Sequence, residues 1–253
     1  MNVSFENKVV VITGGSTGIG AEAAKAFADA GAKVVVNYLH SEQRAMDVVK
    51  SIEEKGGEAI AVKADVTSST DVEKLFEKTI ENYNRVDVLV NNAGGLLVRC
   101  PFEELTEEDW DRVYDLNVKS VFLCSKEAVR FMKENENGAI INLTSVAARN
   151  GGGAGALHYA SAKGAVLTLT KGMAKELLQY NIRVNAISPG VISTPFHDKY
   201  TPENIRSGFL KGIPMGREGR SDECVGAILF LASEYASYIC GETIEINGGQ
   251  MMD

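Results

Sequence analysis

Histidine and cysteine are scarce in this chain, whose 253 residues include three histidines and four cysteines. The cysteines lie far apart and form no C-x-x-C pair, so neither a disulfide framework nor a zinc site of the usual spacing is indicated. We therefore expect buried thiols in a reducing compartment and no metal centre. The residues concerned are Cys100, Cys124, Cys224, Cys240, His40, His158 and His197.

An excess of positive charge and long apolar runs are lacking as well. Lys and Arg total 26 against 34 Asp and Glu, and the formal net charge of −8 argues against a nucleic-acid or polybasic membrane partner. No apolar run reaches the roughly 18 residues of a membrane-spanning helix. Residues 1–8 contain no apolar stretch of the secretory kind. These absences predict a cytoplasmic protein with no nucleic-acid or membrane partner.

What the chain does contain is a regular alternation of short β-branched runs and longer segments of helical period. The runs are apolar nearly throughout, as in strands that are buried on both faces of a parallel sheet. The alternation predicts one α/β domain over residues 1–253, a three-layer Rossmann-type doubly wound parallel sheet of about seven strands. The expected strands are 9–13, 33–38, 59–66, 86–91, 139–144, 183–187 and 243–246. The expected helices are 20–30, 41–55, 69–82, 107–133, 156–178 and 221–233.

One region, residues 193–219, fits this alternation poorly. It contains three of the five prolines, Pro195, Pro202 and Pro214, together with four glycines. A long insertion between a strand and a helix of a compact domain is often a mobile cover over a site. We expect this segment to act as a substrate lid.

The first expected strand runs into a glycine-rich turn, Thr13-Gly14-Gly15-Ser16-Thr17-Gly18-Ile19-Gly20, and a helix follows. Gly14 permits a tight turn, Gly18 lets the backbone approach a phosphate, and Gly20 lets the helix pack on the strand. The free N–H groups of a helix N-terminus then favour an anion. The turn therefore predicts a dinucleotide pyrophosphate site. Its expected contacts are Gly14, Ser16, Thr17, Gly18, Ile19 and Gly20.

The end of the second strand bears on the choice of dinucleotide. NAD sites usually place Asp or Glu there to bind the ribose 2′-hydroxyl. Here the first acidic residue is Glu42, so nothing at the strand end repels a 2′-phosphate. The pattern favours NADP, with NAD as a second cofactor. The expected contacts are Asn37, Tyr38, His40 and Ser41, with Arg44 nearby.

The third and fourth strands end at the same edge of the predicted sheet, where ligands of open α/β sheets bind. Asp65 and Val66 follow the third strand, and a carboxylate there is placed to accept a hydrogen bond from an adenine amino group. Asn91, Ala93 and Gly94 follow the fourth strand, and their small size leaves room for a ribose or a flat ring. We expect all five to contact the cofactor.

Tyr159 and Lys163 stand four residues apart at the start of a long apolar helix, so both side chains lie on one face. A phenol that acts as a base near neutral pH needs its pKa lowered by about 3 units, and a neighbouring ammonium favours the phenolate. Ser145, which closes the fifth strand, would lie at the same pocket and donate to a substrate carbonyl. The three residues predict proton transfer at a carbonyl or alcohol.

These motifs resemble the single-domain branch of the short-chain dehydrogenase/reductase family, and the resemblance extends from Thr13 to Gly249. Residues 13–20 resemble its cofactor turn and residues 91–94 its N-N-A-G stretch. Ser145, Tyr159 and Lys163 resemble its catalytic residues, and Lys163 would also hold the nicotinamide ribose. The resemblance further implies that Asn117 holds a relay water behind the lysine. It also assigns the segment 189–194 to the nicotinamide carboxamide, through Pro189, Gly190, Ile192 and Thr194.

The resemblance implies an NAD(P)-dependent oxidoreductase that interconverts a secondary alcohol and a carbonyl by hydride transfer. NADP-preferring members often carry Arg or Lys where this chain has Thr17, which leaves dual cofactor use open. The Asn-Tyr end of the second strand resembles that of bacterial glucose dehydrogenases, so we expect a small sugar or polyol as substrate. The 3-oxoacyl-thioester reductases of the family share the motif set and are the alternative. The candidate pocket walls are 95–97, 146–148, 151–158 and 196–200.

Two other classes remain as alternatives. A nucleotide-sensing protein would have lost part of the Ser/Tyr/Lys/Asn set, which is intact here. An epimerase or dehydratase would return the hydride to its substrate and usually carries a larger C-terminal domain. The family resemblance also implies a homotetramer, with the helices 107–133 and 156–178 at one interface and residues 242–253 at the other.

Overall fold

A seven-stranded parallel sheet forms the centre of the computed structural model, which describes residues 3–201 and 203–252. The strand order is β3-β2-β1-β4-β5-β6-β9, so the order reverses beside β1. This sheet, with helices on both faces, confirms the predicted doubly wound α/β fold. The strands are β1 (Val9–Ile12), β2 (Lys33–Tyr38), β3 (Glu58–Lys63), β4 (Val88–Asn91), β5 (Gly138–Leu143), β6 (Ile182–Pro189) and β9 (Thr243–Ile246).

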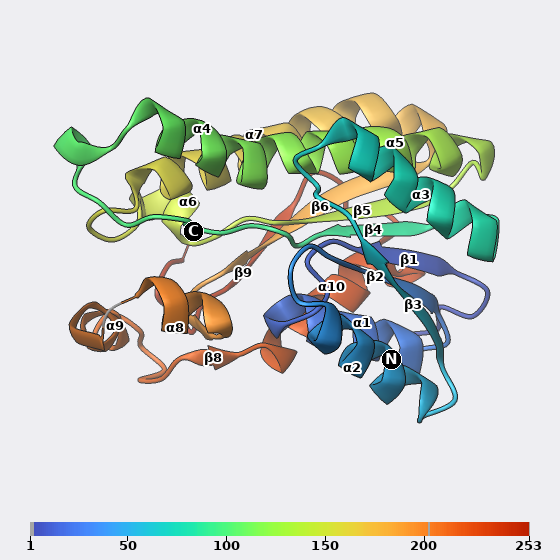
Figure 1. Ribbon diagram of the computed structural model, residues 1–253, viewed down its shortest axis with the longest axis horizontal. Coiled ribbons are helices and arrows are strands. Elements are labelled where there is room, and N and C mark those ends of the chain that lie inside the picture. Colours follow the sequence, from blue (N-terminus) through green and yellow to red (C-terminus); the bar gives the residue numbers. More distant parts are fainter. Residues whose placement is uncertain (1–2, 202, 253) are drawn as a thin grey trace.

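Helices cover the two faces of the sheet in separate groups (Figure 1). One face carries α1 (Gly18–Asp29), α2 (Glu42–Glu53) and α10 (Asp222–Ala232). The other carries α3 (Ser69–Tyr83), α4 (Glu107–Tyr114), α5 (Ser120–Glu134) and α7 (Leu157–Leu177). Short 3₁₀ turns lie at η1 (Phe102–Glu104), η3 (Leu178–Tyr180) and η4 (Glu234–Ala236). Within the described residues, no helix is both long and apolar enough to cross a membrane.

The strands are apolar on both sides because each side faces a layer of helices. In β1, the side chains of Val10 and Ile12 pack into the cluster with α1, α2 and α10. Those of Val9 and Val11 pack into the cluster with α3, α5 and α7. All four are at most 1% exposed, so a polar substitution on either side of β1 would enter a core.

The carboxyl ends of the central strands open at one edge of the sheet. Parallel pairing aligns Val90 of β4 with Ile141 of β5, and Asn142 of β5 with Ala186 of β6. The turns that follow β1, β4, β5 and β6 therefore leave the sheet on the same side. This edge is where an open α/β sheet binds its ligand.

The helix expected over 107–133 is divided by a single turn of π-helix, η2 (Asp115–Lys119), between α4 and α5. The helical period continues through the turn, which is why the sequence pattern reads as one helix. A π-turn inserts one residue into the helical ladder, and such turns are frequent at functional sites. Here the turn contains the buried residue Asn117.

The segment 193–219 does contain secondary structure. Its helices are α8 (Pro195–Tyr200) and α9 (Glu203–Leu210), and a two-stranded parallel sheet joins β7 (Ile192–Ser193) to β8 (Gly219–Arg220). Arg206 of α9 ties the segment together, because its guanidinium binds the carboxylates of Glu218 and Asp198. These elements lie beyond the carboxyl edge of the sheet, below α6 (Ala147–Asn150) in the view of Figure 1.

Candidate active site

The glycine turn after β1 is clamped to the segment that follows β4. The Thr13 hydroxyl accepts the backbone N–H groups of Asn92 and Ala93, both at 3.0 Å. In return, the Asn92 amide donates to the carbonyls of Thr13 and Gly14 at 2.8 and 2.9 Å. A Cβ on Gly20 would lie 2.5 Å from the Asn92 amide nitrogen, so only glycine fits there. Asn92 was not predicted as a site residue, although it stands inside the N-N-A-G stretch.

The start of α1 fits a dinucleotide pyrophosphate. Gly14 and Gly18 have φ of +61° and +57°, backbone conformations that glycine adopts without strain. The N-cap residue Thr17 does not cap the helix with its side chain, so the N–H groups of Gly18, Ile19 and Gly20 lack side-chain acceptors. Thr194 packs on the same turn, because a Cβ on Gly18 would lie 3.3 Å from its methyl carbon. The turn and the nicotinamide segment therefore meet.

Asn37 holds the turn itself rather than projecting from the end of β2. It is 2% exposed, and its Oδ1 accepts the Gly14 N–H at 3.1 Å. Its Nδ2 donates to the Ala64 carbonyl at 3.0 Å. The other predicted contacts of this strand end differ in exposure, since Tyr38 is buried while His40 is exposed and Ser41 half-buried.

A hollow of about 480 Å³ lies between the glycine turn and α2. Ser16 and Arg44 line it, together with Lys25, whose ammonium pairs with Glu22 at 2.9 Å. The hollow places a guanidinium close to the turn, where a 2′-phosphate would need it.

The remaining predicted cofactor residues fall at the same edge. Asp65 caps the turn after β3, where its Oδ1 accepts the N–H and hydroxyl of Thr67 at 2.9 and 2.7 Å. The Asn91 amide is buried and donates to Ser125 and Asn142. Val66 is buried, Ala93 half-buried and Gly94 exposed.

The segment after β6 is held by its backbone. Gly190 donates its N–H to the Ile246 carbonyl at 2.9 Å, and a Cβ on it would lie 2.8 Å from Asn247 Cα. Pro189 and Ile192 are buried, and the Thr194 hydroxyl donates to the Ile192 carbonyl at 3.2 Å. Thr194 is thus the residue of this segment that meets the glycine turn.

The structure brings Ser145, Tyr159 and Lys163 together between β5 and α7. Ser145 follows β5, and its hydroxyl is hydrogen-bonded to the Tyr159 phenol. Lys163, one helical turn after Tyr159, is 4% exposed and donates to the Leu143 carbonyl at 2.8 Å. Its Nζ lies 5.8 Å from the centre of the Tyr159 ring. One strand end and one helical turn therefore supply the whole constellation.

Burial governs the titration of both groups. It raises the pKa of Tyr159 to about 12, against a smaller lowering by the Ser145 hydrogen bond, and it lowers the pKa of Lys163 to about 8. The expectation that Lys163 brings the Tyr159 pKa down is wrong for the protein alone, because desolvation disfavours the phenolate more than its neighbours favour it. At neutral pH Tyr159 is a phenol with a proton to donate.

Asn117 lies beside Lys163 inside the π-turn and is fully buried. Its amide donates to the carbonyls of Gly95 and Val113, both at 2.8 Å, and its Oδ1 accepts the Gly95 N–H at 3.1 Å. A Cβ on Gly94 would lie 2.8 Å from Asn117 Oδ1 and 3.0 Å from Lys163 Nζ, so the two side chains meet over Gly94. Both N–H donors of the amide are therefore used within the protein, while its oxygen accepts one hydrogen bond.

The segment 193–219 contributes an aromatic wall. The Phe196 ring of α8 lies 5.7 Å from the Tyr159 ring, and Tyr200 lies 5.4 Å from Phe196. Both residues fall in the predicted wall 196–200. Arg99 donates to the carbonyls of Ala154 in the predicted wall 151–158 and of Tyr200 in the predicted wall 196–200, and it falls outside the predicted ranges itself.

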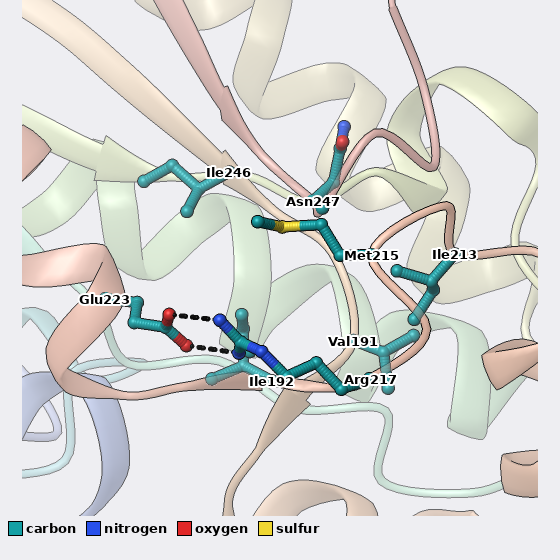
Figure 2. A pocket seen from close by; sticks show the side chains of 10 residues that line it. Val191, Ile192, Ile213, Met215, Arg217, Glu223, Ile246 and Asn247 are labelled. Carbon is teal, nitrogen blue, oxygen red and sulfur yellow. Dashed lines mark hydrogen bonds and ion pairs between the residues drawn. The ribbon is translucent and has the colours of Figure 1, made fainter.

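A separate apolar hollow of about 400 Å³ lies behind the segment after β6 (Figure 2). Ile213, Met215 and Ile246 line it, and an ion pair between Arg217 and Glu223 closes one side. None of the four predicted catalytic residues reaches it, so we do not place the reaction there. In the part of the chain that the structure describes, no cluster of His, Cys, Asp or Glu is able to hold a metal.

A family model described as Enoyl-(Acyl carrier protein) reductase matches residues 14–251. Among curated relatives, a 3-oxoacyl-[acyl-carrier-protein] reductase of Synechocystis is 43% identical over 97% of each chain. One of Thermotoga maritima is 41% identical over 97% of this chain and 98% of its own.

Two solved structures are also similar to this chain over nearly its whole length. A short-chain type dehydrogenase/reductase from Mycobacterium marinum superimposes with a TM-score of 0.93 at 35% identity, covering 99% of this chain and 98% of its own. A 7α-hydroxysteroid dehydrogenase complexed with NADH and 7-oxo glycochenodeoxycholic acid gives 0.93 at 37% identity, covering 100% and 98%.

The parallel sheet, the glycine turn and the Ser/Tyr/Lys cluster define an oxidoreductase of Rossmann-type fold. The chain belongs to the short-chain dehydrogenase/reductase family, as its sequence resemblance indicated. The family uses nicotinamide cofactors. Cytoplasmic location, the homotetramer and the lid stay predictions.

Proposed function

We propose that this protein is an NADP(H)-dependent reductase of 3-oxoacyl thioesters. The observation that carries the proposal is the Tyr159 phenol hydrogen-bonded to the Ser145 hydroxyl, one helical turn from the buried Lys163. The curated relatives, named 3-oxoacyl-[acyl-carrier-protein] reductases, supply the substrate class. The names of these relatives do not support the expected sugar or polyol substrate. The alternative substrate class, 3-oxoacyl thioesters, takes its place.

The residues present fit a bound dinucleotide. The glycine turn and the start of α1 would hold the pyrophosphate, residues 65–66 the adenine side, and residues 189–194 the nicotinamide. Arg44 and Ser16, at the hollow beside the turn, support a 2′-phosphate and hence NADP; the acidic residue of the same lining, Asp47, lies on α2 with Arg44. When bound, the reduced nicotinamide supplies a hydride to the carbonyl carbon.

The chain's own residues then bind the carbonyl oxygen of the substrate and supply its proton. The Ser145 hydroxyl donates a hydrogen bond to it and fixes its position. Tyr159 donates its proton as negative charge develops there, because a phenol with a pKa of about 12 carries that proton at neutral pH. Lys163, held by the Leu143 carbonyl, places a positive charge behind the phenol and eases the loss of that proton. Phe196 excludes water on the side of α8.

The test follows nicotinamide absorbance with 3-oxobutanoyl N-acetylcysteamine thioester, glucose and a simple secondary alcohol, using NADPH or NADH for reduction and NADP or NAD for oxidation. We expect thioester reduction, faster with NADPH. Tyr159→Phe should lose about 100-fold or more of this rate, the usual share of a general acid. Tyr238→Phe, at a fully exposed tyrosine, serves as the matched control. Turnover of glucose alone would overturn the proposed substrate class, and full turnover by a folded Tyr159→Phe variant would overturn the role of the phenol.

A further inference from the structure

Arg99 joins three of the segments that surround the catalytic residues. Its Nε donates to the carbonyl of Tyr200 at the end of α8, at 2.9 Å. Its Nη1 donates to the carbonyl of Ala154, in the loop before α7, at 2.5 Å. The guanidinium is therefore held between the segment after β4, the approach to the catalytic helix and the predicted lid.

The backbone on both sides of Arg99 is fixed to the start of α7 and to the loop before it. The carbonyl of Val98 lies 3.1 Å from Nε2 of the fully buried His158, and the N–H of Cys100 donates to the Gly155 carbonyl at 3.2 Å. A Cβ on Gly155 would lie 2.9 Å from Arg99 Cγ, so only glycine leaves room for this side chain. The side chain is thus placed by its surroundings rather than free at the surface.

The positive charge of Arg99 has no counter-ion in residues 3–201 and 203–252. Both of its acceptors are neutral carbonyls, whereas Arg149 pairs with Glu245 and Arg206 with Glu218. Burial lowers the pKa of Arg99, which reports a partly desolvated cation. A desolvated charge that lacks an opposite charge is costly, and such groups cluster at binding sites.

Another arginine with only carbonyl partners shows what a structural role looks like. Arg183 binds the carbonyls of Leu231, Ala232 and Ser233, at the C-terminus of α10, where the helix dipole supplies negative charge. Arg99 has one carbonyl from a six-residue helix and one from a turn. A guanidinium carries five N–H donors, and these two contacts use two of them.

Arg99 is set apart from the reacting centre by two rings. Phe196 lies against Tyr159, Tyr200 lies against Phe196, and Arg99 binds the Tyr200 carbonyl. It would therefore meet a part of the substrate that lies away from the carbonyl undergoing reduction. The Phe209 ring of α9 packs on Gly153 beside Arg99, because a Cβ on Gly153 would lie 2.9 Å from that ring and 3.8 Å from Arg99 Nη1.

We propose that Arg99 is a specificity-determining residue that binds an anionic oxygen group of the substrate remote from the reacting carbonyl. The inference rests on the proposed function. In a 3-oxoacyl thioester the group is either the phosphate of a pantetheine arm or a carboxylate at the far end of the acyl chain. A guanidinium recognises both through the same planar pair of donors.

The experiment compares three 3-oxoacyl thioesters. The first is 3-oxobutanoyl N-acetylcysteamine, which has no anion. The others are 3-oxobutanoyl 4′-phosphopantetheine and the N-acetylcysteamine monothioester of 3-oxohexanedioic acid, whose far carboxylate is free. Wild type and Arg99→Met are compared by kcat and KM, with Arg99→Lys as the variant that keeps the charge and loses the fork. Arg112→Met, at an exposed surface ion pair on α4, is the matched control. Binding of each thioester is measured separately by calorimetry on the Tyr159→Phe background with NADPH present, so it does not depend on turnover.

We expect Arg99→Met to raise KM for one of the two anionic thioesters by about tenfold or more relative to the uncharged one, as loss of a charged hydrogen bond does. The affected thioester identifies the anion as phosphate or carboxylate, and Arg99→Lys should fall in between. Equal changes for all three thioesters would overturn the proposal and leave Arg99 a structural bridge.

The binding arm separates the two proposals. Thioesters that bind with the Arg99 dependence but are not reduced would remove the proposed function and keep the Arg99 site. Thioesters that are reduced without any dependence on Arg99 would keep the proposed function and remove the Arg99 site. Thioesters that neither bind nor react would overturn both.

Discussion

Replacing Lys163 by methionine tests the buried site through its effect on stability. The lysine has a pKa of about 8 in the folded protein against an ordinary value of 10.5. Because the folded-state pKa is the lower one, protonation favours the unfolded chain. The resulting penalty is complete below pH 8 and disappears as the pH rises through 10.5. A shift of this size corresponds to about 3 kcal/mol, at about 1.4 kcal/mol per pKa unit.

Lys163→Met removes this penalty together with the hydrogen bond to Leu143, and only the penalty depends on pH. We therefore expect the stability of Lys163→Met, relative to wild type, to fall by about 2 kcal/mol between about pH 7 and about pH 9.5. The measurement is urea unfolding at fixed protein concentration over this range, which stays below the pKa of Tyr159. Lys171→Met is the control, since Lys171 is an exposed residue of the same helix.

A difference between wild type and Lys163→Met that stays constant with pH would refute the reasoning. It would mean that the Lys163 ammonium stays hydrated in the folded protein. Water would then have to enter the site, contrary to the close packing around Gly94 and Asn117. If the stability of Lys163→Met relative to wild type rose with pH instead, the folded protein would stabilise the charged form of Lys163. Parallel behaviour of Lys171→Met would assign the pH dependence to the unfolded chain instead.

Three further substitutions test other parts of the molecule. Gly94→Ala places a methyl group 2.8 Å from Asn117 Oδ1 and 3.0 Å from the Lys163 ammonium, so kcat/KM should fall about tenfold or more in steady-state kinetics, and an unchanged kcat/KM would contradict the packing of the two side chains over Gly94. Gly20→Ala places a methyl group 2.5 Å from the Asn92 amide and displaces the clamp, so NADPH should bind more weakly in a fluorescence titration, and unchanged affinity would contradict the fit to the turn. Arg183→Met leaves four backbone carbonyls without their donor and should lower the free energy of unfolding by about 3 kcal/mol, measured in urea; a loss under about 1 kcal/mol would show that water replaces the guanidinium.

The features that could be predicted from the sequence are those formed by contiguous or regularly spaced residues. The apolar run of β1 and the glycines behind it are contiguous, and each has a physical reason to be there, so both the strand and the turn follow from reading along the chain. Tyr159 and Lys163 are equally legible, because a spacing of four puts them on one helical face. Ser145 follows from its position at a strand end.

The features that were not predictable depend on distant partners. The Asn37 amide turns inward because Gly14 and Ala64 present backbone groups to it, and nothing near Asn37 in the sequence signals this. The π-turn around Asn117 shifts a helical ladder by one residue without altering the apolar pattern. Arg99 meets a carbonyl 101 residues away. The direction of the Tyr159 pKa shift likewise depends on burial, which the sequence does not display.

The catalytic residues and the expected substrate contacts are held by different elements of the fold. Ser145 and the carbonyl that holds Lys163 both come from the end of β5, while Tyr159 and Lys163 come from one turn of α7, so the proton-transfer geometry depends on the packing of a single helix against a buried strand. Phe196 and the partners of Arg99 lie instead on α8 and in the loop before α7. Changes in the segment 193–219 should therefore alter KM and substrate choice before they alter the proton transfer itself. That separation is what allows members of one fold family to share their chemistry and differ in their substrates.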